Sequence, residues 1–399
     1  MNNSTPNATS LSATPHSSRL MIGLYATAVF FYWMALYLYV PTLSTYAESK
    51  TDSLALVGFV IAQYGIWQAF IRFPLGIASD WVGRRKPFII GGFVLAGLGA
   101  LVMGRASGID ELAIGRAISG LAAGTWVVLV VGFSSLFPPR EAVRASALLT
   151  FIGSAGRVLA TGVTGWLNGL GGYPLAFFAA TGAAALAIIV ALLTKEQRRP
   201  PKPPSLKSVI HLSLRRDVLL PSLVAAASQY ANWATTFGFT PILAKGLGAT
   251  DVALSMLTSM NIGVVIAGNL AAATISKRIG ARWMAVIAFA LMAVGITGIA
   301  LAPSLPLLFL AQFCVGLAQG ASNPVLMGLS IRFVEEEQRA TAMGLHQAVY
   351  AIGMFTGPWL SGVLADQIGI PPMYWATAAG CLVVGLLTAR LLAARQAGE

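Results

Sequence analysis

Three arginines, Arg72, Arg116 and Arg157, lie inside long apolar stretches of this sequence. A guanidinium group carries five N–H donors, so it suits anions and other hydrogen-bond acceptors. Inside a membrane span an unpaired arginine costs about 2.5–3.5 kcal/mol even on the mildest scale, so it must face a wet cavity or a partner. No acidic residue lies in any of these stretches. The sequence therefore predicts a cationic interior that is able to bind a solute.

The three arginines differ in expected depth. Helix geometry places Arg157 within about 2 Å of the middle of its span, where snorkelling cannot reach water, so we expect it to bind substrate. The alternative is a structural role in a network of backbone carbonyls. Arg116 either joins the same site, or snorkels to the interface, or pairs with Glu111. Arg72 is expected about 9 Å from one boundary. It therefore suits snorkelling or the lining of a gate better than substrate binding.

Aromatic and amide side chains recur in the same spans and complete the predicted substrate site. The candidates beside Arg157 and Arg116 are Tyr32, Trp33, Gln63, Tyr230, Trp233, Asn323 and Tyr350. Aromatic residues at helical spacing also serve as packing or as an interfacial belt. Buried amides are harder to explain that way, since each needs a hydrogen-bond partner in hydrocarbon.

Few residues are suited to carrying a proton across the membrane. All 14 acidic residues lie in loops or at the ends of apolar stretches. The candidates are Asp80, Glu111 and His346, and an imidazole has an intrinsic pKa near 6.5, which suits a carrier. The alternative for His346 is a structural histidine that is hydrogen-bonded within the bundle.

The stretch Gly76-Ile-Ala-Ser-Asp80-Trp-Val-Gly83-Arg84-Arg85-Lys86 lies between two apolar runs. Gly76 is expected to let two helices approach closely, and Gly83 to permit a tight reversal of the chain. A carboxylate at Asp80 can accept N–H bonds from the N-terminus of a neighbouring helix. The basic residues that follow are typical of a cytoplasmic loop.

The elements that must position these residues are membrane helices. The chain has 399 residues, of which 56% are hydrophobic and 10% charged, far from the composition of a soluble domain. Twelve apolar runs of spanning length predict an all-α membrane protein in the cell (inner) membrane. Of 26 Lys and Arg, 20 lie in one set of alternate loops and tails. By the positive-inside rule both termini are cytoplasmic, and this basicity indicates no nucleic-acid partner.

The twelve spans divide into two related halves. We expect a disordered tail (1–19), a first six-helix bundle (20–194), a Pro-rich and basic linker (195–217) and a second bundle (218–399). Trp33-x₇-Pro41 recurs as Trp233-x₇-Pro241, and Gly120-x₃-Gly124 recurs as Gly316-x₃-Gly320. Such repeats predict two pseudo-symmetric bundles facing each other across a midplane cavity. Aligning Arg144 with Arg339 makes Ile352 the counterpart of Arg157.

The pattern G-x-x-S-D-x-x-G-R-R at 76–85 resembles the loop 2–3 signature of the major facilitator superfamily, and the resemblance covers the whole chain. It implies that Asp80 latches the first half to the eleventh span and stabilises the outward-facing state. It also implies that Arg84 relays charge to an acidic partner, for which Glu141 is the candidate. Trp81 departs from the family, which usually has a basic residue there.

The same resemblance is nearest to the twelve-helix drug:proton antiporters. Arg116-x₃-Gly120-x₃-Gly124 is similar to the family's span 4 motif, whose arginine is implicated in proton transfer or substrate binding. The span 5 antiporter signature is incomplete, because Gly153-x₈-Gly162 lacks the later proline, while Gly344-x₈-Gly353-x₃-Gly357-Pro358 lies in the other half. This placement leaves the direction of transport open.

Other classes of protein lack their motifs here. The sequence has neither a Walker A sequence, nor His-Glu-x-x-His, nor a pair of carboxylates within the membrane, so ATP-driven transport and intramembrane hydrolysis are not indicated. We predict a monomeric secondary transporter without cofactor or metal, which exports a small amphiphilic organic solute in exchange for protons. The alternatives are uptake or exchange of an organic anion, and a non-transporting sensor on the same scaffold.

Overall fold

The computed structural model describes residues 15–138, 141–196, 212 and 215–396, and their regular elements are all helical. The first half comprises α1 (Pro15–Tyr37), η1 (Val40–Thr42), α2 (Leu43–Glu48), α3 (Leu54–Val82), α4 (Lys86–Gly104), α5 (Ile109–Gly124), α6 (Trp126–Ser134) and α7 (Ala142–Leu193). The second half comprises α9 (Arg216–Asn232), η3 (Trp233–Phe239), α10 (Thr240–Gly246), α11 (Asp251–Ile279), α12 (Ala281–Leu301), α13 (Leu305–Ile331), η4 (Glu336–Gln338), α14 (Arg339–Ile368) and α15 (Ile370–Gln396).

These helices account for the twelve predicted crossings. In the described chain, ten segments are long and apolar enough to span a membrane, and one of them, Arg144–Leu193, has 50 residues. It lies within α7, where the backbone leaves helical geometry at Gly171 and Gly172, and Gly172 has a φ of +68°. Glycine adopts that angle readily, so α7 reverses there and crosses twice. The broken helix formed by α9, η3 and α10 supplies the remaining crossing.

The internal duplication is visible in how the helices break. Around Pro41 the chain forms the 3₁₀ turn η1, and just before Pro241 it forms the π-helix η3. Proline lacks an N–H and clashes with the preceding turn, so both copies of the Trp-x₇-Pro repeat interrupt the α-helical hydrogen bonds. The break divides the first crossing of each half into a long and a short helix.

Repeated glycines also pack equivalent helices together. A Cβ at Gly120 of α5 would come within 2.8 Å of the Tyr64 carbonyl oxygen of α3. In the second half, a Cβ at Gly320 of α13, the counterpart of Gly124, would come within 2.9 Å of Gly268 on α11. Real Cβ atoms do not approach so closely, so only small residues allow these helix pairs to meet.

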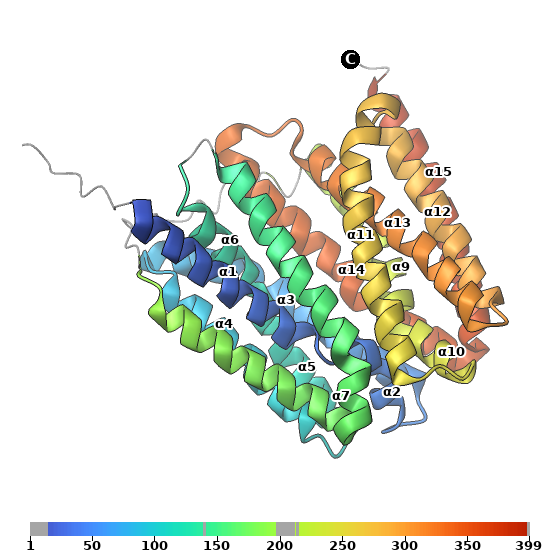
Figure 1. Cartoon of the computed structure of the whole chain (residues 1–399). Coiled ribbons are helices and arrows are strands. Elements are labelled where there is room, and N and C mark those ends of the chain that lie inside the picture. Colours follow the sequence, from blue (N-terminus) through green and yellow to red (C-terminus); the bar gives the residue numbers. More distant parts are fainter. Residues whose placement is uncertain (1–14, 139–140, 197–211, 213–214, 397–399) are drawn as a thin grey trace, which may run out of the picture.

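The two halves meet along two helix pairs. Helix α3 packs along α14, and α7 packs along α11. Figure 1 shows the first half in blue to green and the second half in yellow to red, with α14 beside α3. We call the end of the bundle with the Asp80–Lys86 turn the basic end. The opposite end carries the starts of α3 and α11.

One predicted boundary needs correction. Helix α1 begins at Pro15, so the last five residues of the tail predicted as disordered (1–19) are helical. An α-helix tolerates proline in its first turn, which lets this one start there. The remainder of that tail, and most of the predicted linker, lie outside the described residues.

Candidate functional site

Arg116 lies deep in the first half, with 1% of its surface exposed. Its guanidinium carbon is 4.3 Å from the centre of the Tyr64 ring and 5.9 Å from that of Tyr39. Nε and Nη1 have no hydrogen-bond partner among the described residues. The electron-rich aromatic faces therefore stabilise the cation where a carboxylate would be expected.

Neither structural alternative for Arg116 holds in this conformation. Its burial excludes snorkelling to the interface. Glu111 does not pair with it, because its carboxylate accepts hydrogen bonds from the backbone N–H and hydroxyl of Ser107, at 2.5 and 3.1 Å. Glu111 thus stabilises the start of α5 and does not neutralise the guanidinium of Arg116.

The aromatic contact of Arg116 continues across the interface between the halves. The ring of Tyr64 on α3 stacks on Trp233 of the second half, with centroids 5.4 Å apart and ring planes 17° apart. Trp233 in turn contacts Phe237 at 4.8 Å. A displacement of one half relative to the other would separate Tyr64 from Trp233, so this stack couples the surroundings of Arg116 to the relative position of the halves.

Arg157 lies on α7 against the aromatic residues of α1. Its guanidinium carbon is 4.8 Å from the Trp33 ring and 5.7 Å from the Tyr37 ring. Nη2 donates a hydrogen bond of 2.8 Å to Ser154. Its Nε and the indole Nε1 of Trp33 are buried and have no partner in the described part of the chain. Two unpaired donors beside an aromatic surface suit a solute with a ring and a hydrogen-bond acceptor.

The structural counterpart of Arg157 is Met354, and the expected Ile352 is wrong. A Cβ on Gly165 would collide with the Asp251 carbonyl at the start of α11, and one on Gly362 with the Leu54 carbonyl at the start of α3. When Gly165 is aligned with Gly362, the second half is shifted by two residues relative to the alignment of Arg144 with Arg339. Arg157 then corresponds to Met354. Ile352 lies on the outside of the bundle with 49% of its surface exposed.

Arg72 joins the two halves. Its Nη1 donates hydrogen bonds to Gln347 Oε1 at 3.0 Å and to the Tyr350 hydroxyl at 3.2 Å, both on α14. The side chain is only 5% exposed. His346 lies one turn from Tyr350, contacts the edge of its ring and is hydrogen-bonded through Nδ1 to Ser222 at 3.0 Å. Arg72 therefore lies at the interface between the halves, and its role in a gate stays a prediction.

The remaining predicted substrate residues are satisfied within their own halves. The Tyr32 hydroxyl donates to the Ala122 carbonyl at 2.8 Å, and Gln63 accepts from the Trp67 indole at 2.9 Å. Tyr230 is hydrogen-bonded to Ser361 at 3.1 Å, and Asn323 to Gln319 at 3.1 Å. In this conformation Tyr32 and Tyr230 each join two helices, while Gln63 and Asn323 are hydrogen-bonded within their own helix.

Sequence reasoning missed Tyr64, although its position in the second span, next to Gln63, was a usable signal.

A groove of about 410 Å³ lies within the second half, whereas the predicted cavity lies between the two halves. Residues of α9, α12, α14 and α15 line this groove, and Tyr230 is the only predicted substrate residue among them.

The predicted latch residues lie at the basic end, and this conformation does not engage them. The Asp80 side chain is 57% exposed and pairs with Arg85 of its own turn at 3.3 Å. Glu141 pairs with Arg144 at 3.3 Å, while Arg84 is exposed and does not contact Glu141. Gly83 ends α3 with a φ of +66°, which confirms the tight reversal. The close approach expected at Gly76 is absent, since a Cβ there would lie 3.8 Å from Val127.

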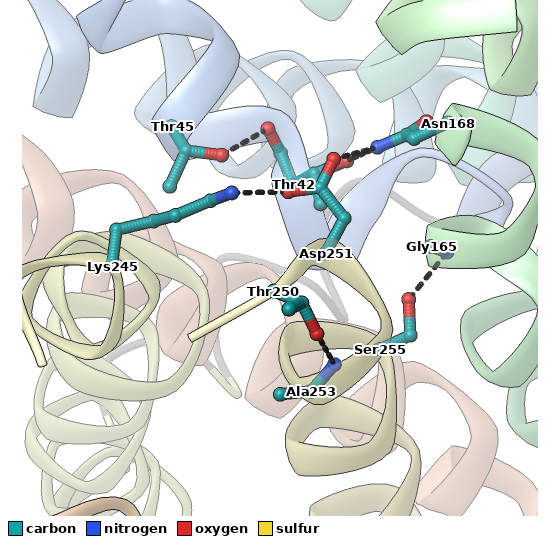
Figure 2. A network of polar contacts seen from close by, with 9 residues as sticks. All are labelled: Thr42, Thr45, Gly165, Asn168, Lys245, Thr250, Asp251, Ala253 and Ser255. Atoms are coloured by element: carbon teal, nitrogen blue, oxygen red, sulfur yellow. Dashed lines mark hydrogen bonds and ion pairs between the residues drawn. The ribbon is translucent and has the colours of Figure 1, made fainter. Parts of the chain in front are cut away.

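At the opposite end the two halves are joined by a polar network (Figure 2). Asn168, near the end of the first pass of α7, donates hydrogen bonds to Asp251 Oδ2 at 2.9 Å and to the Thr42 hydroxyl at 3.0 Å. Asp251 also forms an ion pair of 2.5 Å with Lys245. The Gly165 N–H donates to the Ser255 hydroxyl at 2.6 Å. Nothing in the sequence marked these residues beyond their place at helix ends.

The comparisons with known proteins agree on one family. The model described as Major Facilitator Superfamily matches residues 25–228 and 222–399. The multidrug resistance protein MdtH of Aeromonas hydrophila is 24% identical over 344 residues, which are 84% of this chain and 85% of MdtH. The inner membrane transport protein YajR of Escherichia coli is 33% identical over 137 residues, 34% of this chain and only 30% of YajR.

The fold of solved transporters is the same. A bacterial homologue of the human lysosomal transporter Spinster superposes with a TM-score of 0.78 at 15% identity, over 96% of this chain and 98% of that one. The family model covers both halves of the chain, and the helices repeat in the order that the internal duplication predicts. The chain therefore belongs to the major facilitator superfamily of transporters, and it is a multi-pass membrane protein.

Proposed function

We propose that the chain exports a small amphiphilic organic solute by alternating access of its two halves. The observation that carries this proposal is the pair of arginines on aromatic rings, Arg116 and Arg157, both with unpaired buried donors. Aromatic faces bind the apolar part of a solute, while the guanidinium and indole N–H groups bind its acceptor. The name of MdtH, a multidrug resistance protein, supports efflux of such a compound.

Proton entry is the proposed source of energy. Asp80 and Glu111 are exposed at the two ends of the bundle, and His346 lies between Ser222 and Tyr350. Because Tyr350 also accepts a hydrogen bond from Arg72, a change in the protonation of His346 would act on a contact between the halves. This arrangement supports His346 as the carrier within the bundle.

Purified protein in proteoliposomes tests both parts of the proposal. Aromatic solutes with acceptor groups should move against their gradient when a pH gradient is imposed, and collapse of the gradient should stop them. His346→Gln should retain exchange of solute at equal concentrations and lose accumulation. Flux that ignores the pH gradient would contradict proton coupling, and the absence of any flux would favour the sensor alternative.

Exchange of an organic anion is the second candidate. It is favoured by the lack of any carboxylate beside Arg116 and Arg157 in the described chain. Counterflow without a pH gradient separates the two functions. An anion exchanger would load a labelled aromatic carboxylate against its own unlabelled form and would discriminate against neutral analogues. The proposed exporter would accept both.

A further inference from the structure

The opposite end of the bundle contains two polar contacts between the halves that are built in the same way, and we call them the first and the second lock. In the first lock, Asp366 near the end of α14 accepts hydrogen bonds from the N–H groups of Leu54 and Ala55 at 2.6 and 3.0 Å, and from the Ser53 hydroxyl at 2.8 Å. These groups form the start of α3. A helix N-terminus has unpaired N–H groups and a partial positive charge, so a carboxylate is a fitting partner.

The second lock lies at the start of α11. Thr250 caps this helix as Ser53 caps α3, since each side chain accepts the N–H group three residues later. Gly165 and Gly362 bring the partner helices equally close, because a Cβ on either would collide with the carbonyl of the first residue of the capped helix. By this alignment Asp251 corresponds to Leu54, and the two locks are related by the internal repeat.

The locks differ in which helix carries the acid. In the first lock, the capped helix begins with apolar residues, so the partner helix α14 supplies the carboxylate Asp366. In the second lock, the capped helix carries its own carboxylate, Asp251, so the partner helix α7 supplies a donor, the amide of Asn168. Lys245 balances the remaining charge of Asp251. In each lock the first half donates hydrogen bonds and the second half accepts them.

The first lock is also the reverse of the predicted latch at the basic end. Helices α3 and α14 run antiparallel and remain packed along their length. Asp366 at the end of α14 holds the start of α3 here, while Asp80 at the end of α3 is unengaged. One helix pair therefore carries a carboxylate at each end, and only that at the opposite end is engaged.

We propose that Asp366 and the Asn168–Asp251 pair are positioning residues that hold the opposite end closed during the transport cycle. The proposal rests on alternating access as the proposed function. Release of both locks frees the starts of α3 and α11, which allows the halves to separate at this end. The solute itself is not needed for this step.

A distance measurement across the opposite end tests the proposal. Spin labels are placed on Arg105→Cys and Leu307→Cys, two exposed positions in different halves, with Cys314 and Cys381 replaced by alanine. In lipid nanodiscs, Asp366→Asn should raise the ratio of long to short distances about tenfold, the effect of weakening hydrogen bonds to a charged group. Asp52→Asn removes an exposed charge two residues from Leu54 and serves as the matched control.

The second lock allows a swap of its charge. Asn168→Asp places two carboxylates together and should open this end, and Asp251→Asn should open it by loss of the ion pair and the charged acceptor. The double variant Asn168→Asp/Asp251→Asn moves the acid to the partner helix, as in the first lock. The ratio of long to short distances should be at least about fivefold lower in the double variant than in Asn168→Asp, because the two changes are coupled.

Clear results would overturn each lock. If Asp366→Asn gives the same distances as Asp52→Asn, the first lock is refuted. If the double variant is at least as open as Asn168→Asp, the second lock is refuted. If a substitution lowers the melting temperature without lengthening the spin-label distance, the substituted residue has only a structural role, and this outcome counts against the proposal. Since no solute is added, normal gating without solute flux would refute the proposed function alone.

Discussion

Arg116 and Arg157 lie over aromatic rings at 4.3 and 4.8 Å, and neither has an acid beside it in the described chain. A ring stabilises a cation without neutralising its charge, so the guanidinium remains able to bind an acceptor. A carboxylate in the same place would compete with the solute. At the scale of residues, this choice of partner is what makes the arginines suited to binding.

Arg157→Met should separate binding from folding. Methionine occupies the equivalent position in the second half, so the scaffold accommodates it. Loss of a charge-assisted hydrogen bond should weaken solute affinity about tenfold or more, while the melting temperature stays equal or rises. Arg157→Lys should lose part of the affinity, because lysine keeps the charge without the planar fork.

Affinity and thermal unfolding measured on the same purified protein decide this prediction. Arg105→Ala removes an exposed arginine and is the control for loss of charge. If Arg157→Met lowers the melting temperature and leaves affinity unchanged, the arginine is structural and does not bind the solute.

At the scale of elements, small residues determine which helices can meet. The glycine face of α5 lies on α3, and its copy on α13 lies on α11. Each of these pairs belongs to one half, and the halves then meet through α3 with α14 and α7 with α11. Rigid pairs of this kind allow a half to move as a unit, because no backbone within it has to change.

Gly120→Ala and Gly91→Ala should change stability in opposite directions. A Cβ at Gly120 would lie 2.8 Å from a backbone oxygen, whereas at Gly91 nothing lies within 4 Å. Overpacking costs about 1–3 kcal/mol, while alanine in an open helical position gains about 0.5–1 kcal/mol over glycine. Thermal unfolding in one detergent measures both, and equal shifts would contradict the packing role of Gly120.

Asp80→Asn concerns the turn between α3 and α4. In this conformation its carboxylate is exposed and contacts only Arg85 among the described residues, so the substitution should not weaken the closed opposite end. It should instead weaken the other conformation, in which Asp80 is predicted to hold the start of α14, by about 1 kcal/mol or roughly fivefold in population. Spin-label distances at the opposite end measure this, with Asp52→Asn, which removes an exposed carboxylate outside the predicted latch, as control. A shift towards the open opposite end would contradict the predicted latch.

At the scale of the whole molecule, the two halves touch through contacts of different kinds along the interface. Hydrogen bonds close the opposite end, aromatic stacking joins Tyr64 to Trp233, and Arg72 reaches Gln347 and Tyr350. At the basic end the predicted latch is open. A movement of one half relative to the other would have to break contacts of all three kinds.

A double-mutant cycle on Tyr64→Ala and Trp233→Ala should show that the stacked rings stabilise the conformation in which the opposite end is closed. Aromatic pairs contribute about 0.5–1.5 kcal/mol beyond their buried area, so the closed population should fall with each single change and show a coupling of that size. Distances at the opposite end report the population. Strict additivity of the two changes would show that the stack does not hold the halves together.

Features that depend on neighbouring residues could be predicted from the sequence. Apolar runs gave the twelve crossings, repeated Trp-x₇-Pro and Gly-x₃-Gly patterns revealed the duplication, and Gly83 predicted the reversal after α3. Hydrogen bonding within a helix and exclusion from water act locally, so composition and spacing suffice. The three arginines also stood out for this reason, since charge in an apolar run is visible without a structure.

Which partner each side chain contacts could not be predicted in this way, because it depends on how the helices pack. Tyr64 and Trp233 are far apart in sequence, as are Asp366 and Leu54, and the repeat aligned Arg157 with the wrong residue until close contacts corrected it. A helical pattern fixes a residue's angle about its own axis and says nothing of the helix placed opposite. Asp251 and Asp366 looked like ordinary acids at helix ends because a lock between halves exists only once the halves are packed together.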